Sequence, residues 1–433
     1  MATFFRLYEQ QFAQLGKTWD ETLRGQTTIN TIEPLNLQAV LAKDFDSFGT
    51  PQNRSGAMRP LFGKSIINTE GAEWKHSRAL IKPTFTKAEL SDVTQFDTFV
   101  ERFFELLPEG EAFDIQPLLH RLFLDVSTDF IFGTSIDALG AGKSEAEEFN
   151  KSFKRLCVSL VSDGNLAGRD KEWLQACGDT HRFIDQQVAR ALKQVNDPPE
   201  KDALPRNRYV VLDEMTKEIR DPIQLRDLVM GVFLPAREAT SILVGNCLFQ
   251  LTRHPEIWKR LRTTALTIEA PFTFEKLKSL VDFRYVLQET IRTIGPAARV
   301  ARLAKKDTIL PKGGGSDQQS PVLVKKGTTV CCGIWCVQHD PDIWGEDVQE
   351  FKPERWQNRT ATWEYIPFSG GPRTCPAMQQ SYIHGIYLLV RLMQRFKRIE
   401  NQDSVFEWSE RWTFVLKAEM VSKSRCIQIN DYN

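Results

Sequence analysis

Phe368-Ser-Gly-Gly371-Pro-Arg373-Thr-Cys375 is the stretch that decides the fold, because it places one cysteine between a glycine-rich loop and an apolar helix. The run from Ile383 to Phe396 has apolar residues at helical spacing. We therefore expect the amides and the positive dipole end of this helix to face the sulfur of Cys375 and to favour its anion. Gly371 lets the backbone approach a flat ligand, and Arg373 offers a cation two residues from the sulfur. The loop predicts a thiolate site.

The loop resembles the haem-binding loop of the cytochrome P450 family, Phe-x-x-Gly-x-Arg-x-Cys-x-Gly. It matches at Phe368, Gly371, Arg373 and Cys375, and it departs at Ala377, where the family usually has glycine. A lone cysteine is commonly a small buried hydrophobe, and that is our interpretation of the other seven. For Cys375 the resemblance implies the metal ligand of a haem b, with Phe368 and Arg373 among the residues that bind the cofactor.

Further cofactor-binding candidates lie upstream. Trp74-Lys-His-Ser-Arg78 has a tryptophan and an arginine one helical turn apart. It resembles the Trp-x-x-x-Arg of the family's third helix, which implies contacts of Trp74 and Arg78 with a haem propionate. Arg302 stands where family members place another propionate-binding arginine, although the neighbouring Arg299 competes for that role. Carboxylates in an apolar cavity need such cationic partners.

Two more motifs imply a structural network. Glu289-Thr-Ile-Arg292 places an acid and an arginine on one helix face, which in isolation is common and contributes little. Phe351-Lys-Pro-Glu-Arg355-Trp356 resembles the meander motif of the same family, whose arginine completes a buried network with the Glu-x-x-Arg pair. The resemblance implies that Glu289, Arg292 and Arg355 support the thiolate side of the haem site and take no part in the chemistry.

The longest predicted helix, Leu225 to Leu251, departs from the family pattern in its middle. The family reads Ala-Gly-x-Asp/Glu-Thr-Thr/Ser there, and fungal hydroxylases of alkanes and fatty acids often read Ala-Gly-Arg-Asp-Thr-Thr. This chain reads Pro235-Ala-Arg-Glu238-Ala239-Thr240. The resemblance implies that Glu238 and Thr240 are the catalytic residues, which help to deliver protons. Ala239 takes the place of the usual hydroxyl, and Thr240 is rotated from it by about 100°.

Pro235 has no N–H for the carbonyl of Gly231, so we expect a bend just before the acid. Two interpretations remain open. The proline either kinks a packed helix, or it opens a groove in which water replaces the missing hydroxyl.

Composition is compatible with a large globular protein. The length of 433 residues suggests two or three domains, but the motifs that build one site extend from Trp74 to Cys375. We therefore predict one cytochrome P450 domain over residues 1–433, mainly α with a small β-region, in which a helical prism encloses the haem.

Lysine plus arginine equals aspartate plus glutamate at 56 each, so the net charge gives no indication of nucleic-acid binding. Eight cysteines without paired spacing favour a reducing compartment.

Periodicity and turn residues predict the elements. Strands are expected around Val322–Val330, a hairpin insertion over Pro311–Pro321 and a flexible connection over Asn196–Asn207. Cys331, Cys332 and Cys336 lie in a strand-like apolar run and are expected in the core rather than on a metal. Helices are expected over residues 35–50, 72–90, 96–107, 115–135, 146–164, 171–195, 223–252, 254–268, 274–294 and 377–397.

No window was expected to approach the ~20 apolar residues of a membrane span. The N-terminal anchor that eukaryotic family members usually carry is accordingly expected to be absent from this chain. From the family, an intracellular location on the cytoplasmic face of the endoplasmic reticulum is expected, with peripheral contact between surface patches and the membrane.

The resemblance implies a monooxygenase that inserts one atom of dioxygen into a lipophilic small molecule, with electrons from NADPH-cytochrome P450 reductase. The substrate would resemble an alkane or fatty acid, or would be an intermediate of secondary metabolism. Two alternatives remain. One is a peroxide-driven or isomerising haem-thiolate enzyme without reductase, and the other is a haem-binding protein without catalysis.

Overall fold

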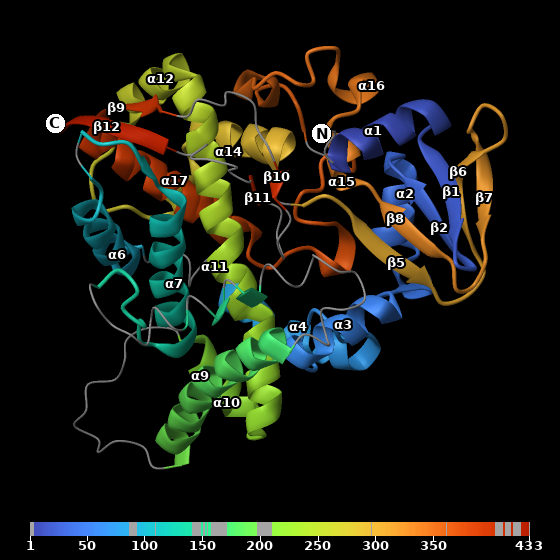
Figure 1. Cartoon of the computed structure of the whole chain (residues 1–433), viewed down its shortest axis with the longest axis horizontal. Helices are drawn as coiled ribbons and strands as arrows, with labels where there is room; N and C mark the ends of the chain where they lie inside the picture. The colour runs from blue at the N-terminus through green and yellow to red at the C-terminus, as the bar shows by residue number, and fades with distance from the viewer. Residues whose placement is uncertain are drawn as a thin grey trace.

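The computed structural model describes residues 4–85, 93–108, 110–140, 149, 152–153, 155–156, 171–196, 210–295, 297–360, 362–402, 410–411, 417–418 and 426–432. Helices dominate the described chain and surround one long central helix, α11 (Figure 1). The helices of the first half are α1 (Phe4–Leu15), α2 (Pro34–Gln38), α3 (Gln52–Phe62), α4 (Gly71–Ile81), α6 (Thr94–Glu105), α7 (Gln116–Phe132), α9 (Lys171–Asn196) and α10 (Val211–Glu218). The helices of the second half are α11 (Pro222–Arg253), α12 (Pro255–Ala265), α13 (Phe274–Lys278), α14 (Val281–Ile294), α15 (Ile334–Gln338), α16 (Pro341–Trp344) and α17 (Met378–Arg395).

The strands form small sheets, of which the largest lies at one side of the molecule (Figure 1). Its order is β1-β2-β8-β5-β3, with β2 and β8 parallel and the other pairs antiparallel. The other sheets pair β6 with β7, β10 with β11, and β12 with both β4 and β9. The strands are β1 (Thr18–Leu23), β2 (Gln26–Thr31), β3 (Phe48–Gly49), β4 (Phe113–Asp114), β5 (Val300–Ala304), β6 (Thr308–Gly314), β7 (Ser320–Val324), β8 (Thr329–Cys332), β9 (Phe396–Asn401), β10 (Glu410–Arg411), β11 (Lys417–Ala418) and β12 (Cys426–Tyr432).

The helix α11 joins two hydrophobic cores. Its first half, up to Leu234, packs with α3, α7, α9 and α10, whereas its second half, from Leu243, packs with α6, α12, α14 and α17. A third core lies between the large sheet and α1. Residues 235–241 of α11 therefore lie between two cores, and there Pro235, Ala236 and Ala239 keep partial exposure. A helix that is buried almost all round but open on one short face is suited to line a ligand site.

Most sequence expectations for the elements are confirmed. The hairpin insertion is present as β6–β7, and Cys331, Cys332 and Cys336 are buried in β8 and α15. The helix expected over 274–294 is two helices, α13 and α14, separated at Ser279–Leu280, and the one expected over 35–50 gives way to a π-helical turn at Ala39–Lys43. The sequence did not predict helices α1, α3, α10, α15 and α16. The predicted connection at 196–207 and most of the predicted helix at 146–164 fall outside the described residues.

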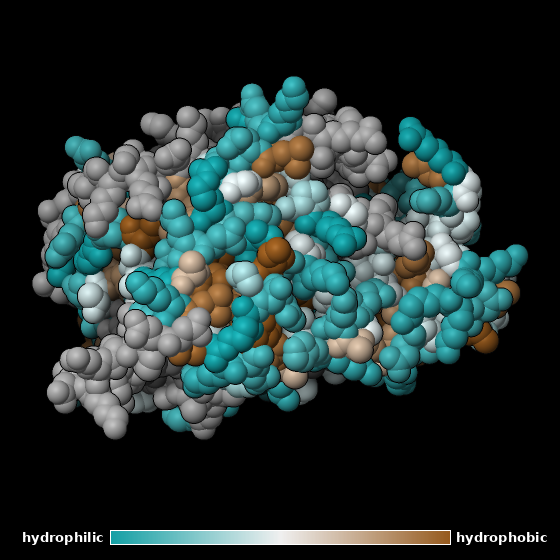
Figure 2. Space-filling view, turned by 90° about the horizontal axis from the view of Figure 1, so that it is seen from below, coloured by the Kyte–Doolittle hydropathy of each residue, from teal (hydrophilic) through white to brown (hydrophobic). Residues whose placement is uncertain are grey.

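Among the described residues, α11 alone is long and apolar enough to cross a membrane, which corrects the expectation that no window approaches a span. However, 83% of its apolar window is buried inside the protein, as expected of a core helix. Among the described residues on the face seen in Figure 2, hydrophilic ones predominate, and the hydrophobic ones form small groups.

Candidate functional site

The loop before Cys375 is held by its own backbone and by packing. The Cys375 N–H donates to the Phe368 carbonyl oxygen at 2.9 Å, and a 3₁₀ turn spans Gly371–Arg373. Gly371 has a φ of +66°, and a Cβ built there would lie 1.9 Å from the carbonyl oxygen of Leu41. Only glycine fits this close approach, so the loop is fixed against the N-terminal part of the chain.

Cys375 lies three residues before α17 and keeps partial exposure. Burial raises the pKa of the Cys375 thiol, while a hydrogen bond from the Ala377 N–H and the positive charge of Arg78 lower it. The expected amide contact is therefore present. Desolvation of the buried thiol opposes its anion and acts against these two contacts. Ligation by a metal cation would supply the missing stabilisation, since it deprotonates a coordinating thiol.

Trp74 and Arg78 on α4 lie next to the loop, as expected. The Arg373 guanidinium stacks 4.6 Å from the ring centroid of Trp74 and donates to the Thr69 carbonyl oxygen at 2.8 Å. Arg78 is close enough to the Cys375 sulfur to affect its pKa, and burial lowers the pKa of Arg78 itself. Four predicted cofactor-binding residues thus meet in one place.

The other two cofactor-binding candidates, Arg302 and Phe368, make different contacts. Arg302 lies on β5 with its side chain buried, and its Nη1 donates to the Ala301 carbonyl oxygen at 3.0 Å. Phe368 packs edge-on against Tyr382 of α17, with ring centroids 5.4 Å apart. Phe368 therefore links the loop to the helix that follows Cys375.

The two predicted catalytic residues on α11 face different neighbours. Thr240 donates from Oγ1 to Ser381 Oγ on α17 at 3.3 Å. Glu238 is buried, forms an ion pair with Arg237, and lies 3.7 Å from His120 Nδ1 on α7. The side chains of Glu238 and Thr240 point in nearly opposite directions because two residues along an α-helix correspond to a rotation of about 200°. Ala239, between them, lies on the partly exposed face. The helix runs without a break through Pro235.

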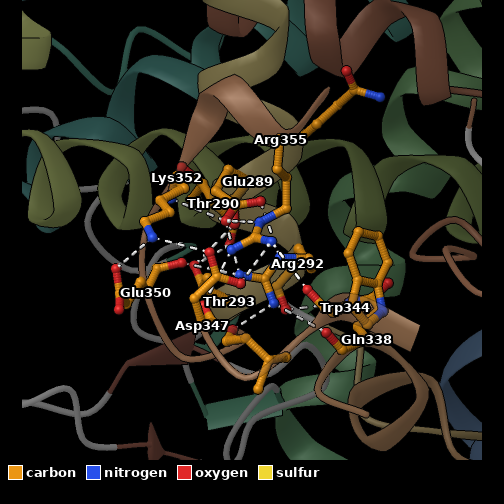
Figure 3. Close-up of polar contacts among 12 residues, drawn as sticks. Glu289, Thr290, Arg292, Thr293, Gln338, Trp344, Asp347, Glu350, Lys352 and Arg355 are labelled. Atoms are coloured by element: carbon orange, nitrogen blue, oxygen red, sulfur yellow. Dashed lines mark hydrogen bonds and ion pairs between the residues drawn. The ribbon is translucent and has the colours of Figure 1, made fainter. Parts of the chain in front are cut away.

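The predicted structural network is present (Figure 3), with the side chains of Glu289 and Arg292 fully buried and that of Arg355 10% exposed. Glu289 accepts from Arg292 Nη2, Arg355 Nε and the Lys352 N–H on Oε1, and from Arg292 Nε and Trp356 Nε1 on Oε2. The Arg292 side chain also donates to the carbonyl oxygens of Gln338, Val348 and Glu350. This buried ion pair therefore fastens the irregular segment that leads toward the cysteine loop.

Sequence reasoning missed a polar group on α7. His120 Nδ1 lies 2.8 Å from Ser241 Oγ, and its Nε2 lies 3.1 Å from Gln116 Nε2. No sequence signal joins His120 to Glu238, since the pairing depends on how α7 packs against α11.

The donor chemistry suits a cofactor held by one protein ligand. The described residues contain no group of three or more His, Cys, Asp or Glu side chains that could enclose a metal ion. Cys375 with Trp74, Arg78 and Arg373 instead offers one sulfur and nearby cations. Such a set fits a metal that brings its own ring of ligands and its own anionic groups.

Comparison with known proteins identifies the family of the chain. The chain matches the cytochrome P450 family over residues 2–422. It is 36% identical to the cytochrome P450 monooxygenase iccC of Talaromyces variabilis, over 90% of this chain and 80% of that protein. It is 34% identical to cytochrome P450 52A10 of Candida maltosa, over 92% and 81% of the two chains. It is also 31% identical to the monooxygenase fsdH of Fusarium heterosporum, over 93% and 73%. A cysteine loop, a mainly helical fold and relatives of this kind lead to one conclusion: the chain belongs to the cytochrome P450 family of haem-dependent monooxygenases.

Proposed function

We propose that this protein uses haem b to insert one oxygen atom of dioxygen into a lipophilic small molecule, with electrons from NADPH-cytochrome P450 reductase. The overall reaction would be RH + O₂ + NADPH + H⁺ → ROH + H₂O + NADP⁺. The observation that carries the proposal is the partly exposed Cys375, with Trp74, Arg78 and Arg373 beside it.

In this proposal Cys375 holds the haem iron, and Arg78, Arg373 and Arg302 hold the two propionates, with Trp74 and Phe368 in contact with the cofactor. The residues fit the group, because one sulfur and several arginines match one open metal position and two carboxylates. When bound, the haem supplies the activation of dioxygen and the transfer of oxygen to the substrate. The protein positions the substrate and moves protons.

Proton delivery is assigned to the middle of α11. Glu238 is the buried acid at the position of the family's acid, and Thr240 contributes a hydroxyl that contacts α17. Ala239 presents a methyl group on the partly exposed face where relatives of the resembled group carry a hydroxyl. Either a substrate hydroxyl or water would then complete the path to the reacting oxygen.

We propose a substrate of the alkane or fatty-acid type, or an intermediate of secondary metabolism. The α11 pattern and the hairpin insertion support the first class. The substitution at Ala239 supports the second, since a biosynthetic substrate can bring its own hydroxyl. The same substitution keeps open the alternative of peroxide-driven or isomerising haem-thiolate chemistry, which needs no delivered protons; a non-catalytic haem-binding protein is the third possibility.

The cellular setting is also a proposal. We place the enzyme as one domain on the cytoplasmic face of the endoplasmic reticulum, near its reductase, with peripheral contact with the membrane. The family relationship supports this location.

The spectrum of the reduced carbon monoxide complex tests the ligand. The wild-type protein should show the strongly red-shifted Soret band of thiolate-bound haem, and Cys375→Ala should lose it. Cys336→Ala, which removes a buried sulfur from α15, is the matched control and should keep the band. Retention of the band in Cys375→Ala would refute the assignment. Product formation with reductase and NADPH then separates the monooxygenase from the peroxide-driven and non-catalytic alternatives.

A further inference from the structure

Glu238 has two basic partners from two helices. Arg237, its neighbour on α11, forms an ion pair with Glu238 Oε1, and His120 on α7 places Nδ1 3.7 Å from the same oxygen. The Arg237 guanidinium also stacks 4.5 Å from the Phe153 ring centroid. An arginine keeps its proton in proteins, whereas an imidazole exchanges one near neutral pH. Of the two partners, only His120 can pass a proton to Glu238.

The contacts of His120 favour one orientation of its ring. Ser241 Oγ donates to the Glu238 backbone carbonyl oxygen at 2.9 Å, so its oxygen is available to accept from His120 Nδ1–H at 2.8 Å. Nε2 can then accept from the Gln116 side-chain amide at 3.1 Å. This assignment points the Nδ1 proton toward α11, where Ser241 Oγ accepts it and Glu238 Oε1 lies 3.7 Å from Nδ1.

Gln116 suits both protonation states of the ring. Its Oε1 is buried and has no hydrogen-bond partner among the described residues. Turning the amide over would present Oε1 to an Nε2–H, so the same side chain can donate to the neutral imidazole and accept from the imidazolium. The charged groups that face His120 in this arrangement are Glu238 and Arg237, while Asp114 accepts from the Gln116 backbone N–H at 2.9 Å.

The exposures of the His120 and Glu238 side chains indicate the direction in which a proton would move. The His120 side chain is 13% exposed and that of Glu238 is 3% exposed. A proton can therefore reach the imidazole from solvent more readily than it can reach the carboxylate. Transfer of the proton neutralises both His120 and Glu238, and the Arg237 cation that stays beside the carboxyl favours its renewed ionisation once the proton is passed on.

We propose that His120 is the proton donor that resupplies Glu238 during oxygen reduction, with Ser241 and Gln116 orienting its ring. This inference rests on the proposed function, in which Glu238 delivers protons. For the step itself, the Nδ1–H of the imidazolium turns from Ser241 Oγ to Glu238 Oε1 and closes the 3.7 Å separation. Its N–H bond then breaks and the proton passes to Oε1, which leaves a neutral imidazole, a neutral carboxyl and the Arg237 cation. The imidazole then regains a proton from solvent. His120 acts through Glu238 and is a positioning and relay residue.

Proton coupling between the two groups can be measured without turnover. The chain has six histidines, so ring-labelled histidine in the reduced, carbon-monoxide-bound holoprotein gives a tractable NMR spectrum, with the His120 signal assigned by His120→Gln. In Glu238→Gln the titration midpoint of that signal should move down by about one pH unit, because the nearby anion no longer favours the imidazolium. An unchanged midpoint would overturn the proposal.

Turnover provides the second arm, with lauric acid as the lipophilic probe. In His120→Gln, product formation with reductase and NADPH should fall by about 10²-fold while hydrogen peroxide release rises, since glutamine forms hydrogen bonds but carries no exchangeable charge. Peroxide-driven oxidation, RH + H₂O₂ → ROH + H₂O, brings its own protons and should stay close to the wild-type rate. His181→Gln is the matched control, because His181 contacts the Leu61 carbonyl oxygen and no carboxylate.

The outcomes separate this proposal from the proposed function. If His120→Gln couples NADPH to product as well as the wild type, or loses both reactions equally, the relay is wrong. If the wild type oxidises no lauric acid by either route, the substrate class fails, and the NMR titration alone decides the relay.

Discussion

The cysteine loop can take its position only because Gly371 has a hydrogen atom in place of a side chain. The φ of +66° is strained for other residues, and a Cβ would meet backbone rather than a movable side chain. The motif that was recognisable in the sequence thus includes a glycine required by packing against Leu41, in addition to any approach of the backbone to a cofactor.

Gly371→Ala should destabilise the protein by clearly more than the about 1–2 kcal/mol of left-handed backbone strain, because the Leu41 segment must also move. The matched control is Gly327→Ala, with a φ of +87° and nothing within 4 Å of the built Cβ, which should cost only the strain. Urea unfolding measures both free energies. Equal losses in the two variants would mean that the Leu41 contact is not restrictive.

At the scale of elements, α14 organises a segment that has little regular structure of its own. Glu289 and Arg292 bind backbone or side-chain groups between Gln338 and Trp356, and both side chains are fully buried. Removing one partner of a buried ion pair leaves the other charge uncompensated, which is far more costly than losing a surface pair.

Glu289→Ala should therefore lower the free energy of unfolding by about 3–5 kcal/mol and give protein that fails to hold haem. Haem content and chemical denaturation are the measurements. Glu350→Ala serves as the control, because that carboxylate pairs with Lys352 at the surface and its loss should leave the midpoint unchanged. Stable, fully haem-loaded Glu289→Ala protein would contradict the structural role.

The α11 helix carries the second prediction at this scale. Ala239→Thr should leave the fold intact, because threonine costs only a few tenths of a kcal/mol in a helix and can bond back to a carbonyl. Thermal unfolding and the NADPH-to-product ratio are measured together. Higher coupling would identify the native alanine as a weakened relay, whereas lower coupling or a new product would indicate that substrate or water uses that space. Loss of the folded state would refute the prediction.

For the whole molecule, two histidines make stability depend on pH: His339 is buried and His384 is half-buried. Desolvation lowers the pKa of His339 and of His384 to about 4. The unfolded chain binds a proton at each imidazole below about pH 6.5, but the folded chain does so only near pH 4. The stability from these neutral rings is full above about pH 6.5 and is lost as the pH falls toward 4.

The half-buried His384 is stacked on Phe96, a core residue, with ring centroids 4.5 Å apart, and His384→Phe removes its titration. Between pH 7 and pH 5 the wild type should lose about 2 kcal/mol more unfolding free energy than this variant. Denaturant titrations at both pH values make the comparison, with His76→Gln on the exposed face of α4 as the control. Equal losses in wild type and His384→Phe would show that His384 is not protonated on unfolding.

Local patterns predicted much of this architecture. The cysteine loop, the Glu289–Arg292 pair with Arg355, and the β6–β7 hairpin each have a signature within a short window, and each is present. The break between α13 and α14 was missed because the apolar spacing continues across Ser279–Leu280. His120 was missed for a different reason. Its meeting with Glu238 depends on the packing of distant helices, which no window of sequence contains.

The contact between Gly371 and Leu41 also has a consequence for the order of biosynthesis. The chain is made from its N-terminus, so the turn that contains Leu41 leaves the ribosome hundreds of residues before the cysteine loop. When the loop emerges, the N-terminal surface that receives it is already made, whereas α17 and the strands that follow Cys375 are still to come. Cofactor capture is thereby placed late in synthesis, after most of the helices of the chain.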